Sequence, residues 1–300
     1  MDASFGRILT AMVTPFKSDL SIDFESTEKL IHYLIDHGTD TIVVAGTTGE
    51  SPTLSHEEER QLCKFVKNVV KNKVKIVLGA GSNSTQTAVD SSKEAEKLGV
   101  DGILSVVPYY NKPSQDGLLE HFGQIAKSTS LPIILYNIPG RTGINMLPET
   151  TSELASKYQN IIGYKDATGD LDSTSHLYRI APKSLLIYSG DDSLTLPMLS
   201  VGAVGVISVA SHIVGNEMTD MINSFFEGKI ELAKEIHTKL FPLFKALFKA
   251  PNPTCIKAAL EIKGICKSYL RPPLVKLNEK QMNELKQVMN NIGVKQLTTK

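Results

Sequence analysis

Cysteine is scarce in this 300-residue chain, which contains only Cys63, Cys255 and Cys266. A small, odd and scattered set does not form the disulfide framework of a secreted domain, so the sequence predicts a reducing compartment. No two of these cysteines have the spacing of zinc ligands, and the seven histidines form no cluster in the sequence. We therefore expect no metal site.

Net charge is also lacking, because 32 Lys and Arg residues balance 32 Asp and Glu residues. Binding to a phosphate backbone needs a cationic surface, so we expect no nucleic-acid partner. No apolar run approaches the roughly 20 residues that span a bilayer. Residues 1–7 lack the basic and apolar segments of a secretory signal. We expect a cytoplasmic protein that has no membrane partner.

The chain does contain short apolar runs that alternate with longer amphipathic segments. The eight runs cover residues 8–13, 41–45, 75–80, 102–107, 132–136, 161–165, 185–189 and 204–209. They are rich in Val and Ile and apolar throughout, which is typical of parallel strands buried on both faces. Between two of the runs, Ser55 and Glu58 form the capping-box pattern of a helix start. Gly38, Gly99 and Gly202 each precede a run closely, as glycines that end helices do.

Eight such units predict an α/β fold, a (β/α)8 or TIM barrel. A doubly wound open sheet is the alternative, but a nucleotide-binding sheet usually carries a glycine fingerprint after its first strand. Residues 14–17, Thr-Pro-Phe-Lys, contain none. The sequence predicts a barrel domain over residues 1–226 and a small C-terminal α-helical domain over residues 227–300, where helical patterns follow one another without strands.

Active sites of such barrels lie at the carboxyl ends of the strands, so the residues after each run are candidates. Residues 46–50, Gly-Thr-Thr-Gly-Glu, offer backbone N–H groups and the hydroxyls of Thr47 and Thr48 to a carboxylate or phosphate, although a plain turn is equally consistent. Tyr109 and Tyr110 follow the fourth run. They could relay protons or seal a subunit contact, while ordinary packing is the simpler interpretation.

Further candidates follow the later runs. Tyr136 ends the fifth run, and Arg141 follows in a loop bracketed by glycines. Its planar guanidinium suits a substrate carboxylate, whereas a surface arginine in a turn is the alternative. Gly190 follows the seventh run and Ile207 lies in the eighth. For these two residues, tight packing and close approach of a ligand both remain open.

Lys165, at the end of the sixth run, is the most informative residue. Burial penalises the charged ammonium, lowers the lysine pKa and produces the neutral amine that a Schiff-base nucleophile needs. The alternative is that Lys165 lies one residue past the strand and is solvated.

Together these motifs resemble the pyruvate-dependent class I aldolase superfamily, which includes dihydrodipicolinate synthases and N-acetylneuraminate lyases. The resemblance covers nearly the whole chain. Its motifs are residues 46–51, Gly-Thr-Thr-Gly-Glu-Ser, residues 136–139, Tyr-Asn-Ile-Pro, and residues 163–166, Gly-Tyr-Lys-Asp. The double threonine and Arg141 are similar to the synthase branch. The lyases carry a Ser-Thr pair and lack that arginine.

The resemblance implies a role for each candidate. Lys165 would form the Schiff base with pyruvate, and Tyr136 would donate and accept protons. Thr47 and Tyr110 would complete the proton relay, with Tyr110 entering from a neighbouring subunit. The residues implied to bind substrate are Thr48, Arg141, Gly190 and Ile207.

The implied reaction condenses pyruvate with L-aspartate 4-semialdehyde in the diaminopimelate route to lysine, without a metal or organic cofactor. Thr48 would bind the carboxylate of pyruvate, and Arg141 that of the semialdehyde. The implied assembly is a homotetramer built as a dimer of dimers. Two alternatives remain: another pyruvate aldolase, such as an N-acetylneuraminate or 2-keto-3-deoxy sugar-acid lyase, and a catalytically silent binding barrel.

The regulatory lysine site of many family members is matched only in part. Ser51, His56, Asn83 and Tyr109 fit its pattern. Thr87, however, stands where lysine-sensitive enzymes usually carry glutamate, and Glu59 stands where several carry histidine. Because a carboxylate partner for the lysine ammonium is missing, we expect weak or absent inhibition by lysine.

Overall fold

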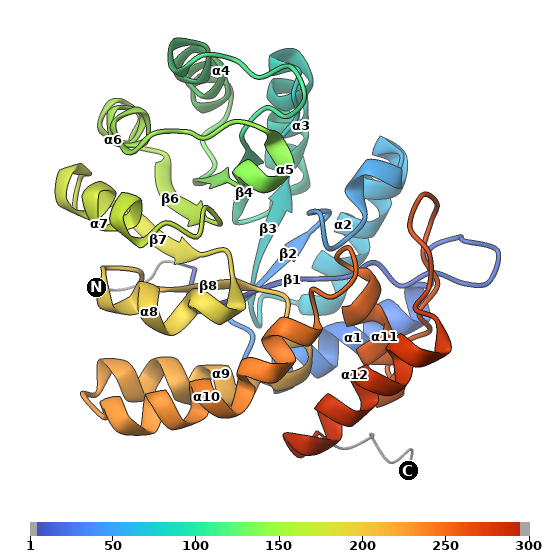
Figure 1. The fold of residues 1–300 in the computed structure, drawn as a ribbon. Helices are drawn as coiled ribbons and strands as arrows, with labels where there is room; N and C mark the ends of the chain where they lie inside the picture. The colour runs from blue at the N-terminus through green and yellow to red at the C-terminus, as the bar shows by residue number, and fades with distance from the viewer. Residues whose placement is uncertain (1–4, 295–300) are drawn as a thin grey trace. The chain divides into compact units, whose positions relative to one another are not determined.

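A computed structural model describes residues 5–294 of the chain. The strands are β1 (Ile8–Ala11), β2 (Thr41–Val44), β3 (Lys75–Gly79), β4 (Gly102–Val106), β5 (Ile133–Asn137), β6 (Ile161–Asp166), β7 (Leu186–Ser189) and β8 (Gly205–Ser208). They follow one another in sequence order around a closed barrel, and the registered pairs are parallel (Figure 1). The predicted (β/α)8 barrel is confirmed.

Helices separate and follow the strands (Figure 1). They are α1 (Phe24–Asp36), α2 (His56–Val70), α3 (Thr85–Leu98), α4 (Gln115–Ser128), α5 (Pro139–Thr142), α6 (Pro148–Lys157), α7 (Leu171–Ile180), α8 (Thr195–Ser200), α9 (Ser211–Phe226), α10 (Ile230–Ala246), α11 (Thr254–Lys263) and α12 (Glu279–Asn291), with short 3-10 turns η1 (Ser51–Thr53) and η2 (Asp192–Leu194). Within the described residues, no helix is long and apolar enough to cross a membrane.

All eight predicted apolar runs form strands, and two strands extend one residue beyond the prediction. β5 includes Asn137 and β6 includes Asp166, and both polar side chains are buried. The strands continue because the backbones of Asn137 and Asp166 pair with each other, and their buried side chains find hydrogen-bond partners inside the protein. The two residues lie at the ends of strands from which candidate side chains project.

The predicted helix start and helix end signals are confirmed. The Ser55 hydroxyl accepts a hydrogen bond from the Glu58 backbone N–H, and the Glu58 carboxylate accepts one from Ser55 N at 2.9 Å. This capping box satisfies two N–H groups that the first turn of α2 leaves free. Helix α3 ends at Gly99, whose φ of 67° lies in the left-handed region that glycine adopts without strain.

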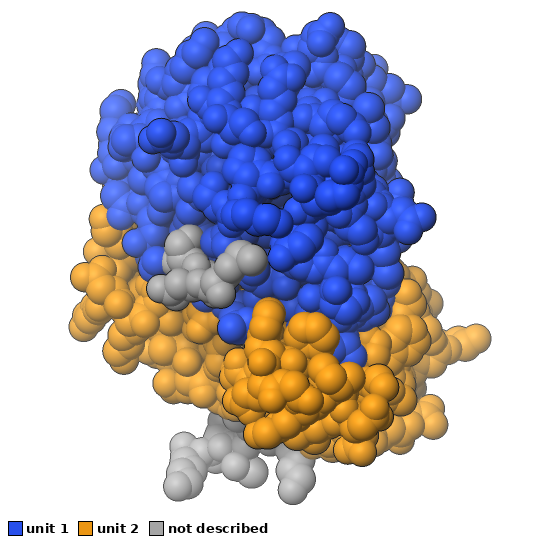
Figure 2. All heavy atoms as spheres, turned by 90° about the vertical axis from the view of Figure 1, so that its left-hand side faces the viewer, with its two compact units in different colours: residues 1–7, 75–207 blue, residues 8–74, 208–300 orange. Residues whose placement is uncertain are grey.

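The chain divides into two compact units, residues 1–7 with 75–207 and residues 8–74 with 208–300 (Figure 2). In the first, strands β3 to β8 pair in register one after another. In the second, β1 pairs with β2, and α10 packs on α9 and α12. Helices α10, α11 and α12 follow the predicted helical segments, and the domain boundary between residues 226 and 227 stays a prediction.

Candidate active site

Lys165 lies within β6 and is buried, with 7% of its surface exposed. Its Cα is paired with Tyr136 of β5 on one side and with Tyr188 of β7 on the other. The Nζ atom lies 4.1 Å from the centroid of the Tyr136 ring. The alternative of a solvated lysine past the strand end is therefore wrong for this structure.

Burial lowers the pKa of Lys165 to about 8, against an opposing contribution from the Asp192 carboxylate and a further lowering by the Arg141 guanidinium. At pH 7, about one amine in ten is then neutral, compared with fewer than about one in a thousand for an exposed lysine. A neutral amine on a rigid strand is the nucleophile that attacks a carbonyl carbon.

Tyr136, which is paired with Lys165 in the sheet, is also buried, with 7% of its surface exposed. Burial raises the pKa of its hydroxyl to about 12, although the positive charge of Arg141 works in the opposite direction. The phenol is therefore protonated at neutral pH and can donate a proton to a departing oxygen.

Asn137 organises the loop that carries Arg141. Its Nδ2 donates to Asn145 Oδ1 at 2.7 Å and to Tyr164 Oη at 2.9 Å, and its Oδ1 accepts from Met146 N at 3.2 Å. These bonds hold the far side of the loop against the end of β5. Arg141 itself lies exposed in the short helix α5, where a substrate carboxylate can reach it.

Gly190 lies where the segments after β6 and β7 come together. Its N–H donates to Asp166 O at 2.6 Å, and a Cβ at this position would lie 2.7 Å from Ala167 Cβ and 2.9 Å from Asp166 O. Close packing therefore requires glycine here, as one of the two sequence interpretations held. Ile207 is buried in β8, also within the first unit.

Asp192 is a candidate that sequence reasoning missed. Its side chain is 2% exposed, and its negative charge raises the pKa of Lys165. The same negative charge would stabilise a positively charged imine on Lys165. A carboxylate within a polar Asp-Asp pair gave no sign in the sequence that it would be buried near the lysine.

The loop with Thr47 and Thr48 belongs to the second unit, whereas Lys165, Tyr136, Arg141, Gly190 and Ile207 belong to the first. Its backbone turns on itself, because Gly49 N donates to Gly46 O at 3.0 Å and Glu50 N to Thr47 O at 3.1 Å. Thr47 is half-buried and Thr48 is buried.

Residues far along the chain hold this loop, and no sequence pattern marks them. Asn252 Nδ2 donates to Thr48 Oγ1 at 2.8 Å. The buried Glu50 carboxylate accepts from Lys257 Nζ, and from Arg271 N at 3.0 Å. The loop is thus tied to the C-terminal helical segment by two side chains.

Tyr110 behaves differently from the other candidates. Its side chain is 88% exposed and its φ is 72°, a left-handed conformation that costs energy for a residue with a Cβ. Tyr109, beside it, is 41% exposed. The simpler interpretation of ordinary packing is wrong for Tyr110 within a single chain.

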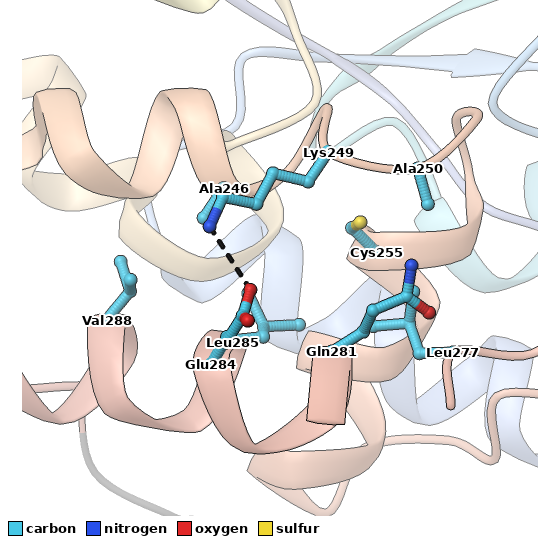
Figure 3. A pocket seen from close by; sticks show the side chains of 9 residues that line it. All are labelled: Ala246, Lys249, Ala250, Cys255, Leu277, Gln281, Glu284, Leu285 and Val288. Carbon is cyan, nitrogen blue, oxygen red and sulfur yellow. Dashed lines mark hydrogen bonds and ion pairs between the residues drawn. The ribbon is translucent and has the colours of Figure 1, made fainter. Parts of the chain in front are cut away.

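A separate pocket lies among α10, α11 and α12 (Figure 3). Lys249 and Glu284 form an ion pair of 3.3 Å at its side, and Cys255 faces it. Burial raises the pKa of the Cys255 thiol, which keeps it protonated and a poor nucleophile. Because this thiol stays protonated, the pocket is a weaker catalytic candidate than the site around Lys165.

Comparisons with known proteins point to one family. A family model described as the dihydrodipicolinate synthetase family matches residues 4–292. The 4-hydroxy-tetrahydrodipicolinate synthase of Desulforamulus reducens is 50% identical over 96% of this chain and 97% of its own length. That of Microcystis aeruginosa is 52% identical over 97% of this chain and 98% of its own.

A crystal structure of the enzyme from Cyanidioschyzon merolae with lysine bound is 46% identical to this chain. It superposes with a TM-score of 0.94 and covers 96% of this chain and 98% of its own. With a matching family model over nearly the whole length and relatives at half identity, the chain belongs to the dihydrodipicolinate synthetase family.

Proposed function

We propose that this chain is a 4-hydroxy-tetrahydrodipicolinate synthase, which condenses pyruvate with L-aspartate 4-semialdehyde through a Schiff base on Lys165. The observation that carries the proposal is the buried Lys165 amine, whose pKa is lowered to about 8 and which lies 4.1 Å from the ring centroid of Tyr136. Relatives at 50% and 52% identity that bear this name support the choice of reaction.

The first half of the reaction activates pyruvate. The neutral Lys165 amine attacks the ketone carbon, and the ketone oxygen leaves as water after the Tyr136 hydroxyl supplies a proton. The resulting protonated imine draws electrons from the neighbouring methyl group. Loss of one methyl proton then produces an enamine, and Asp192 offsets the positive charge of the imine that precedes it.

The second half forms the carbon–carbon bond. The enamine carbon attacks the aldehyde carbon of the semialdehyde, whose oxygen becomes the product hydroxyl. The amino group of that substrate then attacks the imine carbon and displaces Lys165, which closes a six-membered ring and restores the free lysine. One water molecule is released in total.

Each of the two substrates carries a carboxylate, and we propose a separate binding residue for each carboxylate. Thr48, with the Thr47 backbone, binds the pyruvate carboxylate in this proposal, and Gly190 and Ile207 also contact pyruvate. Arg141 binds the carboxylate of the semialdehyde. Each residue lies in or follows a strand of the barrel near its carboxyl end, where barrel enzymes place their active sites.

Tyr110 is proposed to act in a second copy of the chain. The left-handed backbone of Tyr110 costs energy, and its side chain is 88% exposed, so its own chain buries little of it. Insertion into a neighbouring copy, beside Thr47 and Tyr136, would recover that cost and complete a proton relay. The relay requires at least a dimer. In line with the family resemblance, we propose a homotetramer assembled as a dimer of dimers, and we also propose a cytoplasmic location.

Pyruvate consumption with two different acceptors tests the reaction. With L-aspartate 4-semialdehyde the protein should consume pyruvate, and with N-acetylmannosamine it should not. Turnover with the sugar alone would keep the Lys165 chemistry but replace the synthase by a lyase that acts on polyhydroxylated substrates.

Arg141→Ala tests the acceptor site in the same assay. Loss of a charge-assisted contact should lower kcat/KM for the semialdehyde by about tenfold or more, with pyruvate binding retained. Arg179→Ala is the matched control, because Arg179 is also exposed but lies on α7 and contacts His176. Equal losses in both variants would contradict the role of Arg141.

A further inference from the structure

Asn252 stands out because it serves a hydroxyl that the proposed function assigns to substrate. It lies just before α11, 204 residues from Thr48 in the sequence, and is buried. Its Nδ2 donates to Thr48 Oγ1 at 2.8 Å. Its Oδ1 is buried and has no hydrogen-bond partner among residues 5–294.

The direction of this hydrogen bond decides what Thr48 can do. A hydroxyl has one hydrogen to donate and two lone pairs that accept. Because the Asn252 carboxamide donates to the oxygen, the hydroxyl hydrogen of Thr48 is left for another acceptor. A substrate carboxylate is an acceptor only, so it needs this hydrogen.

The unpaired Asn252 oxygen indicates that the carboxamide does not serve folding alone. An unsatisfied buried acceptor destabilises the folded state, and natural proteins rarely keep one without a functional reason. An apolar side chain of similar size would avoid this cost, but it would leave Thr48 without a donor.

The surrounding contacts make this arrangement rigid. Glu50, two residues after Thr48, receives hydrogen bonds from Lys257 Nζ and Arg271 N. Lys257 also donates to Tyr269 O at 2.8 Å, and its Nζ lies 4.0 Å from the centroid of the Phe16 ring. Because the segment that carries Asn252 is anchored to the same loop, Asn252 and Thr48 keep a constant spacing.

We propose that Asn252 is a positioning residue for the 2-oxo acid carboxylate, which acts by polarising and orienting the Thr48 hydroxyl. The proposal deepens the proposed function and rests on it. It assigns to the C-terminal helical segment a share in recognising the first substrate. The segment discriminates 2-oxo acids from neutral ketones, because a neutral ketone offers no carboxylate to Thr48.

Borohydride trapping with two carbonyl compounds tests this. Wild-type protein and Asn252→Asp are titrated with pyruvate and, separately, with hydroxyacetone, and the adduct on Lys165 is measured by mass spectrometry. An aspartate accepts from Thr48 and places a negative charge beside the substrate carboxylate. The concentration of pyruvate that gives half-maximal adduct should rise by about tenfold or more, and that of hydroxyacetone should stay within about twofold.

Asn278→Asp is the matched control, since Asn278 caps α12 and aspartate caps a helix equally well. If Asn252→Asp does not fold, Asn252→Ala replaces it, with a smaller rise that is again confined to pyruvate. An unchanged pyruvate titration, or equal losses with both compounds, would overturn the role of Asn252. Absence of any pyruvate adduct in the wild-type protein would instead overturn the proposed function.

Discussion

At the scale of single residues, Lys165 shows how one position on a strand sets its chemistry. Burial removes water from the ammonium and lowers its pKa to about 8, while Asp192 limits the shift. A still lower pKa of Lys165 would increase the fraction of neutral amine, but the same surroundings would stabilise the protonated imine less. The balance serves both the attack on the ketone and the electron sink that follows.

The rate of Schiff-base formation should follow the ionisation of Lys165. With a pKa of about 8, the neutral fraction rises about tenfold between pH 7 and pH 9. Stopped-flow measurement of imine formation at low pyruvate concentration should show this rise and then a plateau. A rate that still increases steeply above pH 10 would mean that Lys165 titrates as an exposed lysine does.

His212 is a second buried base, and it serves the fold. Its Nε2 accepts from Val13 N at 3.1 Å and its Nδ1 donates to Val209 O at 2.8 Å, so the neutral ring is required. Burial lowers the pKa of His212 to about 4, against an opposing contribution from the hydrogen bond to Val209. Burial alone also lowers the pKa of His121 to about 4.

Acid should therefore destabilise the protein through His212. Below the unfolded pKa of about 6.5, the unfolded chain binds a proton that the folded state refuses until about pH 4. The contribution is complete above pH 6.5 and lost as the pH falls toward 4, by up to about 3 kcal/mol in the free energy of unfolding. Urea denaturation at pH 7.5 and pH 5 should show a smaller pH effect in His212→Gln than in the wild type. An equal effect in both would contradict this role.

At the scale of elements, the 46–50 loop depends on the C-terminal segment. The side chains of Lys257 and Glu50 are 0% and 1% exposed, so neither charge has water as a substitute partner. Removing one partner of a buried pair leaves the other charge uncompensated. The ion pair therefore links the stability of the loop to that of α11.

Lys257→Met should lower the free energy of unfolding by about 3–5 kcal/mol. Glu50→Gln together with Lys257→Met should recover much of that loss, since a neutral carboxamide can still accept from Arg271 N. Chemical denaturation of the two variants gives the comparison. A double variant less stable than Lys257→Met would contradict the prediction. It would show that the uncompensated charge of Glu50 is not the main cause of the loss.

The elements could be predicted well from the sequence, and the partners of the site only in part. Local apolar runs predict strands such as β6, and the capping box of Ser55 and Glu58 predicts the start of α2. Both signals can be recognised in the sequence because each lies within a few residues. The bond between Asn252 and Thr48 joins residues 204 positions apart, and that between Lys257 and Glu50 spans 207. No local pattern marks such pairs, since they arise only when the chain has folded.

For the whole molecule, the expected weak inhibition by lysine depends on the residues at positions 59 and 87. Glu59 is engaged within its own helix, where its Oε2 lies 3.1 Å from His56 Nδ1. Thr87 lies in the first turn of α3 and offers a hydroxyl in place of a carboxylate. Neither arrangement presents a free negative charge to a lysine ammonium.

Free L-lysine should therefore inhibit turnover only weakly. Thr87→Glu should lower the lysine concentration needed for half inhibition by about tenfold or more, because it adds a charge-assisted partner. Gln86→Glu, which places the same charge on the neighbouring residue, is the control. Inhibition of the unaltered protein by micromolar lysine would contradict the prediction.

The proposed mechanism requires Lys165 to carry pyruvate as a Schiff base. The protein is incubated with pyruvate, reduced with borohydride, digested, and the modified peptide is sequenced by mass spectrometry. We expect one reduced pyruvyl group on Lys165, and none in Lys165→Ala. An unmodified Lys165, or an adduct on another lysine, would contradict it.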